Sequence, residues 1–94
     1  MMASGAIFSA AVSAAVTVVG RRSRIKSFIF YNPGASDGEF TLRDGGPTGT
    51  TVIKVNVKAG DTVDHFIHEM GVYCSTDIHC SIPTSGGHAT IFYD

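Results

Sequence analysis

The chain has 94 residues, a length that fits one domain with a modest hydrophobic core. Seven basic and eight acidic side chains give a formal net charge of −1, which provides no general attraction for nucleic acid. Charged residues make up 16% of the chain, against about 25% in an ordinary soluble protein. Because few charges keep molecules apart, we expect partners to cover parts of the surface, and we expect a homo-oligomer.

Residues 1–20 carry no charged side chain, so a signal peptide and a membrane helix must both be considered. A secretory signal has basic residues before its apolar core, whereas here the basic residues follow it. Serine, glycine and alanine dilute the segment too much for a spanning helix. We therefore expect no membrane partner.

The N-terminal segment instead predicts a strand. Val12, Val16 and Val18 fall on alternate positions with Ala14, which indicates one apolar face over residues 11–19. We expect residues 1–20 to form an apolar arm plus this first strand, and residues 21–94 to form the main domain.

From Arg24 onward, short runs of β-branched and aromatic residues are interrupted by Gly, Asp and Pro. This punctuation is typical of an all-β protein, and it predicts a small antiparallel β-sandwich or barrel of about seven or eight strands. The runs are Ile25–Tyr31, Glu39–Arg43, Thr50–Lys58, Val63–His68, Val72–Ser75, Ile78–Ile82 and Ala89–Tyr93.

Alternation within these runs predicts the core. Ile53, Val55 and Val57 alternate with polar residues, so they should point inward. Phe40 and Leu42 alternate in the same way, and the turn residues 44–49 should join the two strands as a hairpin.

The run Ile25–Tyr31 is apolar on both faces after Lys26, so both of its sides should be covered, within the domain or by a subunit contact.

Residues 61–70 fit two patterns. Val63, Phe66, Ile67 and Met70 have helical spacing, and Asp61 could cap a short helix. A strand would instead place Val63, His65 and Ile67 on one face. We favour the strand, because two glycines bracket a segment too short for an ordinary helix.

Histidines and cysteines are the candidate zinc ligands. His65 and His68 are three residues apart, so a strand would send them to opposite faces, and Cys74 and Cys80 are too far apart for a CxxC knuckle. We expect no metal and no cofactor. A disulfide needs one particular register, and free buried thiols are the favoured state. The full candidate set is His65, His68, Cys74, His79, Cys80 and His88.

Few patterns in the sequence point to catalysis. Residues 34–38, Gly-Ala-Ser-Asp-Gly, match the spacing of a Gly-x-Ser-x-Gly turn, but the segments on both sides read as strands, so no helix follows the serine. The glycine-rich segment 45–49 lacks the lysine of a phosphate-binding loop. Asp61 with Asp64, or Asp37 with Glu39, could act as acid and base, but such pairs on turns are usually capping or solubilising residues. We expect no enzyme activity.

Four segments form a recurring set: a strand ending in a Leu-x-Asp-Gly turn, a Gly-Thr strand, a Gly-Val-Tyr hairpin and a terminal Ile-Phe-Tyr. Through these four segments, the chain resembles small virion proteins of short-tailed bacteriophages over about residues 23 to 94. It departs from their pattern at Thr76-Asp77, where a glycine is commoner, and at the cysteines. The segments are Phe40–Gly45, Gly49–Ile53, Gly71–Cys80 and Ile91–Tyr93.

The resemblance implies a non-enzymatic structural protein of the virion, made in the bacterial cytoplasm and used in many copies. It would decorate or cement the capsid, or belong to the head-tail connection, with the major capsid protein or other virion proteins as partners. Repeated copies would turn weak single contacts into firm attachment. The contacts we expect come from the N-terminal arm and the apolar strand: Ile7, Phe8, Val12, Phe28, Phe30 and Tyr31.

The alternative function is a receptor-binding or glycan-binding β-sandwich module. Tyr31, Tyr73, His79 and His88 would then form its surface platform, although the same residues fit ordinary strand packing. Attachment heads usually follow a trimeric shaft, and no shaft repeat precedes this domain.

Overall fold

The structure is a computed structural model, which describes residues 7–67, 70–83 and 86–94. These residues form nine strands and no helix, and none of them therefore forms a helix able to cross a bilayer. The strands are β1 (Phe8–Val12), β2 (Val16–Val19), β3 (Ser23–Tyr31), β4 (Gly38–Asp44), β5 (Thr50–Val57), β6 (Thr62–Phe66), β7 (Val72–Cys74), β8 (Ile78–Ser81) and β9 (His88–Tyr93).

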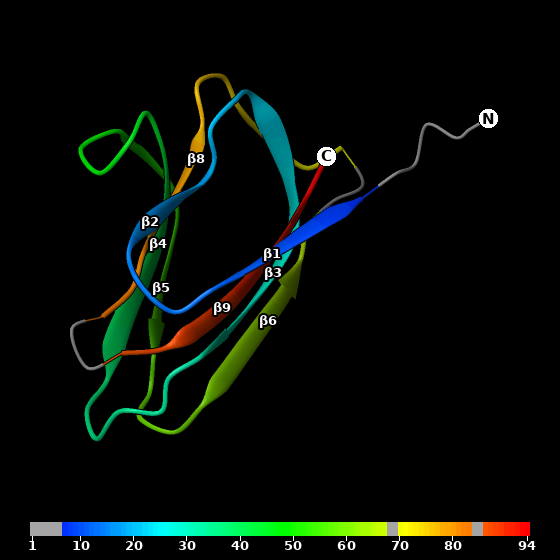
Figure 1. The fold of residues 1–94 in the computed structure, drawn as a ribbon. Coiled ribbons are helices and arrows are strands. Elements are labelled where there is room, and N and C mark those ends of the chain that lie inside the picture. Colours follow the sequence, from blue (N-terminus) through cyan, green and yellow to red (C-terminus); the bar gives the residue numbers. More distant parts are fainter. Residues whose placement is uncertain (1–6, 68–69, 84–85) are drawn as a thin grey trace.

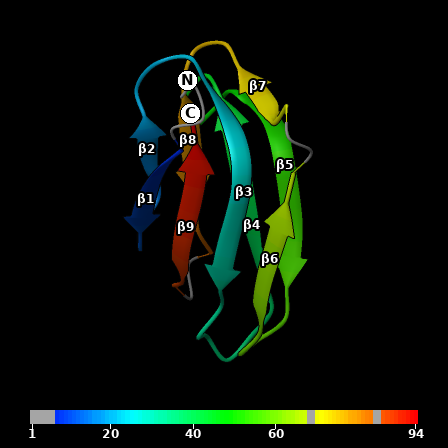
Figure 2. The same cartoon turned by 90° about the vertical axis from the view of Figure 1, so that its right-hand side faces the viewer.

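The strands form two antiparallel sheets packed face to face (Figure 1). Sheet A has the order β1-β9-β3-β6, with β7 also paired to β3, and sheet B has the order β2-β8-β4-β5. Figure 2 shows sheet A in front and β4 and β5 of sheet B behind it. The predicted all-β sandwich is confirmed, with nine strands in place of about seven or eight.

Three phenylalanine rings join the two sheets. Phe30 of β3 stacks on Phe40 of β4 with ring centroids 4.7 Å apart, and Phe28 lies 5.5 Å from the same ring. The rings are fully buried, so their large apolar surface is removed from water at the centre of the sandwich. The rest of the buried apolar core is Val19, Ile25, Leu42, Val57, Cys74, Ile78, Cys80, Ala89 and Ile91.

The orientation of β3 corrects one prediction. Phe28 and Phe30 were expected to form a surface contact, but both point into the core, so this prediction is wrong. Successive side chains of a strand point to opposite faces, and the outward positions of β3 are instead taken by Ile29 and Tyr31. A register shift between Ile25 and Ser27 lets Ile25 also face inward.

The N-terminal segment also differs from the prediction of one strand over residues 11–19. It forms two strands, because the chain bends at residues 13–15 and crosses from one sheet to the other. β1 pairs with β9 in sheet A, and β2 pairs with β8 in sheet B. A register shift in β2 between Thr17 and Val19 turns Val19 into the core.

The strand predicted within residues 61–70 is confirmed over Thr62–Phe66. Val63 and His65 pair with Phe30 and Phe28 of β3, so they share the inward face of sheet A, as the alternation predicted. The predicted hairpin of β4 and β5 is likewise confirmed, with Phe40 and Leu42 buried on its inner face.

A buried asparagine organises the end of the sandwich where β3 stops. The Asn32 side-chain amide donates hydrogen bonds to the carbonyl oxygens of Val57 (2.9 Å) and Ser36 (3.1 Å), and its side-chain oxygen accepts one from the Gly34 N–H (3.0 Å). Its backbone N–H donates to the Asp61 carbonyl. One fully buried polar side chain therefore links the ends of two sheets.

We predict that Asn32→Ala lowers the free energy of unfolding by about 2 to 4 kcal/mol. The substitution removes three side-chain hydrogen bonds and leaves their buried backbone partners without a hydrogen bond. Asn56→Ala is the matched control, since Asn56 is exposed, and it should change stability by no more than about 0.5 kcal/mol. Urea denaturation followed by circular dichroism measures both. Equal stability losses in the two variants would contradict the role of Asn32.

Candidate functional site

The histidines that were weighed as zinc ligands lie apart from one another where the structure describes them. His65 faces the gap between the sheets, His79 is buried and hydrogen-bonds the Thr17 hydroxyl (3.1 Å), and His88 is exposed on sheet A. His68 lies outside the described residues. Within residues 7–67, 70–83 and 86–94, no three His, Cys, Asp or Glu side chains are grouped to hold a metal ion.

The two cysteines are buried and free, as the sequence favoured. Burial raises the pKa of the Cys80 thiol to about 12. Burial, with a smaller contribution from the Asp44 and Asp77 carboxylates, raises the pKa of Cys74 to about 11. Both thiols are therefore held in the unreactive protonated form at neutral pH.

Asp37 and Glu39, one of the two carboxylate pairs considered for catalysis, make side-chain contacts. Asp37 accepts a hydrogen bond from the Ala59 N–H (3.1 Å), and Glu39 forms an ion pair with Lys54 on the neighbouring strand (3.6 Å). The backbone carbonyl of Asp61 accepts a hydrogen bond from the Asn32 N–H. The side chains of Asp37 and Glu39 thus hold a turn and a pair of neighbouring strands at the surface.

Two aspartates instead join the β4–β5 turn to the β7–β8 turn. The Asp44 carboxylate accepts hydrogen bonds from the N–H groups of residues 75–77 (2.8, 2.9 and 3.2 Å) and from the Ser75 hydroxyl (3.1 Å). The Asp77 carboxylate in turn accepts hydrogen bonds from the backbone N–H groups of Gly45 (2.9 Å) and Gly46 (3.1 Å). Both glycines have positive φ, which other residues rarely adopt.

This reciprocal pair gives the Asp77 side chain a structural role at the β7–β8 turn. The hydrogen bonds, led by the one from the Thr76 N–H, hold the pKa of Asp44 below its usual value. Sequence analysis treated the two aspartates as separate turn residues, because nothing in the sequence pairs residues 33 positions apart.

The outward face of sheet A carries large apolar side chains, which we call the outer patch. Ile29 and Tyr31 of β3 are 40% and 41% exposed, and Phe66 of β6 is 76% exposed. Phe66 pairs with Ser27, two positions before Ile29, so the side chains of Phe66 and Ile29 are diagonal neighbours on one face. Phe92 of β9 faces the same side from the other flank of Ser27.

The platform considered for glycan binding is only partly assembled. Tyr31 stacks on His88 of β9 with ring centroids 6.5 Å apart and an angle of 11° between the planes. Tyr73 lies on β7 opposite Arg24, and His79 is buried in sheet B. The four predicted residues therefore do not form one surface.

The N-terminal residues expected to make contacts are partly exposed. Ile7 and Phe8 are 58% and 50% exposed, and the Phe8 ring lies 5.7 Å from the ring of Tyr93. Val12 is half-buried against the core. Because β1 pairs along its length with β9, this segment belongs to sheet A.

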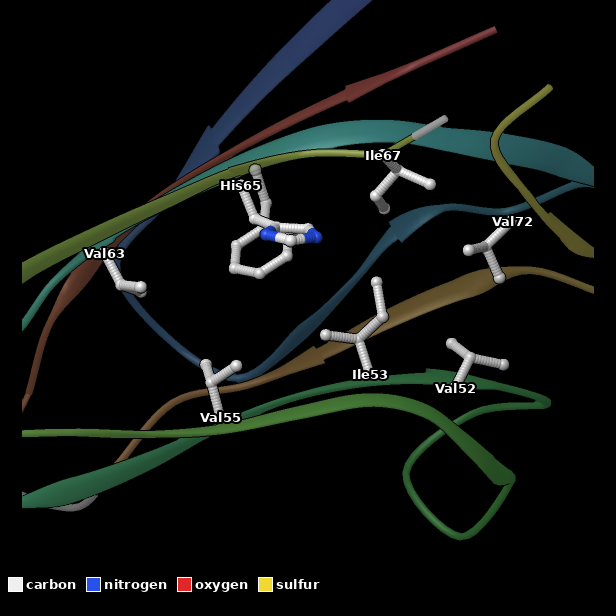
Figure 3. A pocket seen from close by; sticks show the side chains of 8 residues that line it. Val52, Ile53, Val55, Val63, His65, Ile67 and Val72 are labelled. Carbon is white, nitrogen blue, oxygen red and sulfur yellow. The ribbon is translucent and has the colours of Figure 1, made fainter. Parts of the chain in front are cut away.

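A cleft of about 370 Å³, which sequence analysis missed, lies between β5 of sheet B and β6 of sheet A. We call it the lateral cleft. Figure 3 shows Ile53 and Val55 on one wall and Val63, His65 and Ile67 facing them. Alternation predicted inward orientation on both strands but not the space left between them. The lining residues are Phe28, Val52, Ile53, Val55, Val63, His65, Ile67 and Val72.

We predict that neither cysteine reacts with a thiol reagent at pH about 8 while the protein is folded, because both are buried and protonated. Both thiols should react within the mixing time once guanidinium chloride unfolds the chain. Spectrophotometric titration with Ellman's reagent measures this. Rapid labelling of the folded protein would contradict the buried state.

We predict that Asp44→Asn destabilises the protein at neutral pH, because the amide replaces a charged acceptor of four hydrogen bonds. The folded-state pKa of Asp44 is lowered, so its stabilisation is present above the unfolded value of about 3.9 and is lost as the pH falls through the folded value. The difference in Tm between wild type and variant should therefore shrink below pH about 4.

Thermal unfolding across this pH range measures the effect. Asp64→Asn, at an exposed position on β6, is the control and should leave Tm nearly unchanged at every pH. A difference between wild type and Asp44→Asn that does not depend on pH would contradict the role of the Asp44 charge.

A scan against protein-family models finds no match, and no curated protein matches the chain. Among solved structures, one similar chain comes from work described by the words "Bacillus endospore appendages form a novel family of disulfide-linked pili". The TM-score is 0.47 at 17% sequence identity, and the alignment covers 99% of this chain and 94% of that chain. A likeness at this level carries no argument about function.

Proposed function

We propose that this chain is a non-enzymatic structural protein of a bacteriophage virion, which decorates or cements the capsid or forms part of the head-tail connection. Its partners would be the major capsid protein or other virion proteins and further copies of itself, without nucleic acid or membrane. It would be made in the bacterial cytoplasm and incorporated into the particle. The sequence resemblance to phage virion proteins supports the virion as the assembly.

The outer patch is the observation that supports a docking role. Ile29, Tyr31 and Phe66 expose large apolar side chains on one face of sheet A. Covering such a patch with a partner removes apolar surface from water, at about 25 cal/mol per Å². The exposed Ile7 and Phe8 offer a second apolar contact near β1.

The low charge of the chain is consistent with use in many copies. Only 16% of the residues are charged, so like-charge repulsion between neighbouring copies is small. A single patch of this size gives modest affinity, and many copies on one particle make the attachment firm.

The stack of Tyr31 and His88 favours one alternative, a receptor-binding or glycan-binding module. The two nearly parallel rings form a small flat surface on sheet A, where a sugar ring could pack. Since Tyr31 also belongs to the outer patch, the two functions compete for the same face.

Purified phage particles test the virion role directly. Quantitative mass spectrometry of particles from the phage that encodes this chain should find it at a fixed ratio to the major capsid protein. Its absence from particles that have passed a density gradient would overturn the proposal.

We predict that the double variant Ile29→Ser, Phe66→Ser binds particles that lack the protein at least about tenfold more weakly than wild type, because it removes two apolar contacts. The control is Lys54→Ser, Asn56→Ser, which makes two similar replacements at exposed positions of β5 in sheet B. Co-sedimentation with particles over a concentration series measures both affinities. Circular dichroism checks that both variants remain folded. Unchanged binding by the first variant would remove the outer patch from the proposal.

A further inference from the structure

The lateral cleft exists because side-chain size changes across the sandwich. In the middle, the rings of Phe28, Phe30 and Phe40 fill the roughly 10 Å between facing sheets. Towards β5 and β6 the facing walls carry valine and isoleucine, whose shorter side chains do not meet across that distance. The unfilled space measures about 370 Å³, within the range of small-molecule sites.

The two sides of the sandwich differ in how they are closed. At the side of β1 and β2, the chain itself crosses between the sheets at residues 13–15. At the opposite side, β5 and β6 end the two sheets, and each is paired on one side only among the described strands. The cleft lies between these two strands, with its lining side chains facing one another (Figure 3).

The lining is chemically simple. Seven of the eight lining residues are apolar, and His65 is the single polar one. Ordered water needs two to four polar partners, so a lining with one imidazole holds water poorly. The imidazole lies beside the Phe28 ring, with ring centroids 6.0 Å apart, and His65 is exposed to solvent although it lines the cleft between Val63 and Ile67.

We propose that the lateral cleft binds one unbranched aliphatic chain, with a carboxylate head group beside His65. The walls run along two strands: Val52 to Val55 on β5 covers about 10 Å at roughly 3.3 Å per residue. A straight chain follows such walls and contacts valine and isoleucine side chains throughout. Because His65 is exposed to solvent, a carboxylate beside it stays hydrated, and the imidazole N–H can donate a hydrogen bond to it.

This site is separate from the outer patch. Val63, His65 and Ile67 point between the sheets, whereas Ile29 and Phe66 point outward from sheet A. A test can therefore show particle attachment without binding of an aliphatic chain, or binding of an aliphatic chain without particle attachment. The two proposals are thus distinguishable.

The test uses decanoate as the probe, with butanoate as the short-chain control. Titration followed by ¹H–¹⁵N NMR should give saturable shifts of the amides of β5 and β6. Decanoate should bind far more tightly, because each buried methylene raises affinity by about fourfold. Equal affinities for the two, or decanoate shifts confined to sheet A's outer face, would overturn the proposal.

Two variants that fill the cleft locate the site. Val55→Phe and Val63→Phe place a ring in the space from opposite walls, and each should weaken decanoate binding at least about tenfold. Two positions are used so that one poorly folded variant does not decide the result. Ile29→Phe, which adds the same ring on the outer patch, is the matched control and should bind like wild type.

His65→Ala should weaken decanoate binding severalfold while the shifts of β5 remain, because the chain stays in the cleft and loses its head-group contact. An unchanged affinity would overturn the placement of the carboxylate. If wild type binds no decanoate, and Val55→Phe instead changes the oligomeric state measured by light scattering, the cleft receives a second copy of the chain and the proposal is wrong.

Discussion

The stacking of Phe30 on Phe40 between the two sheets is the contact on which the rest of this structure depends. It sets the separation of the sheets at the centre and, with Phe28, provides three of the largest buried side chains. Sheets of this size have little apolar surface to spare, so three rings meeting at one point make up a large part of the core.

That central contact also determines the two surfaces to which we assign roles. Because Phe28 and Phe30 point inward, strand geometry sends Ile29 and Tyr31 outward, where no described part of the chain covers them. Because the rings hold the sheets apart, the smaller side chains of β5 and β6 cannot close the space at the edge. The outer patch and the lateral cleft thus follow from the same row of aromatic residues on β3.

Alternation predicted the fold where a strand has one wet face. Phe40 with Leu42 and Ile53 with Val55 followed the period of two, and their orientation was confirmed. Alternation did not predict the orientation of Ile25–Tyr31. A strand that is apolar on both faces does not indicate which of its faces points into the core. The bend at residues 13–15 was missed for a related reason: its small residues include neither Gly nor Pro.

The candidate sites were harder to predict than the fold. The contacts between Asp44 and residues 75–77 join distant turns, and the lateral cleft is defined by volume that side chains do not occupy. Neither property can be predicted from the spacing of residues within one segment of the sequence. The sequence located single residues, such as His65 and Tyr31, but their grouping depends on the packing of one sheet against the other.

The pairing of β1 with β9 constrains how the protein is made. The first described strand of the chain finds its neighbour in the last, along five paired positions. β9 must therefore be synthesised before sheet A can be completed, and β1 remains without its neighbour while the strands between them are made. Residues 8–12 are in this way exposed to chaperones, or to premature association, for longer than any other described strand.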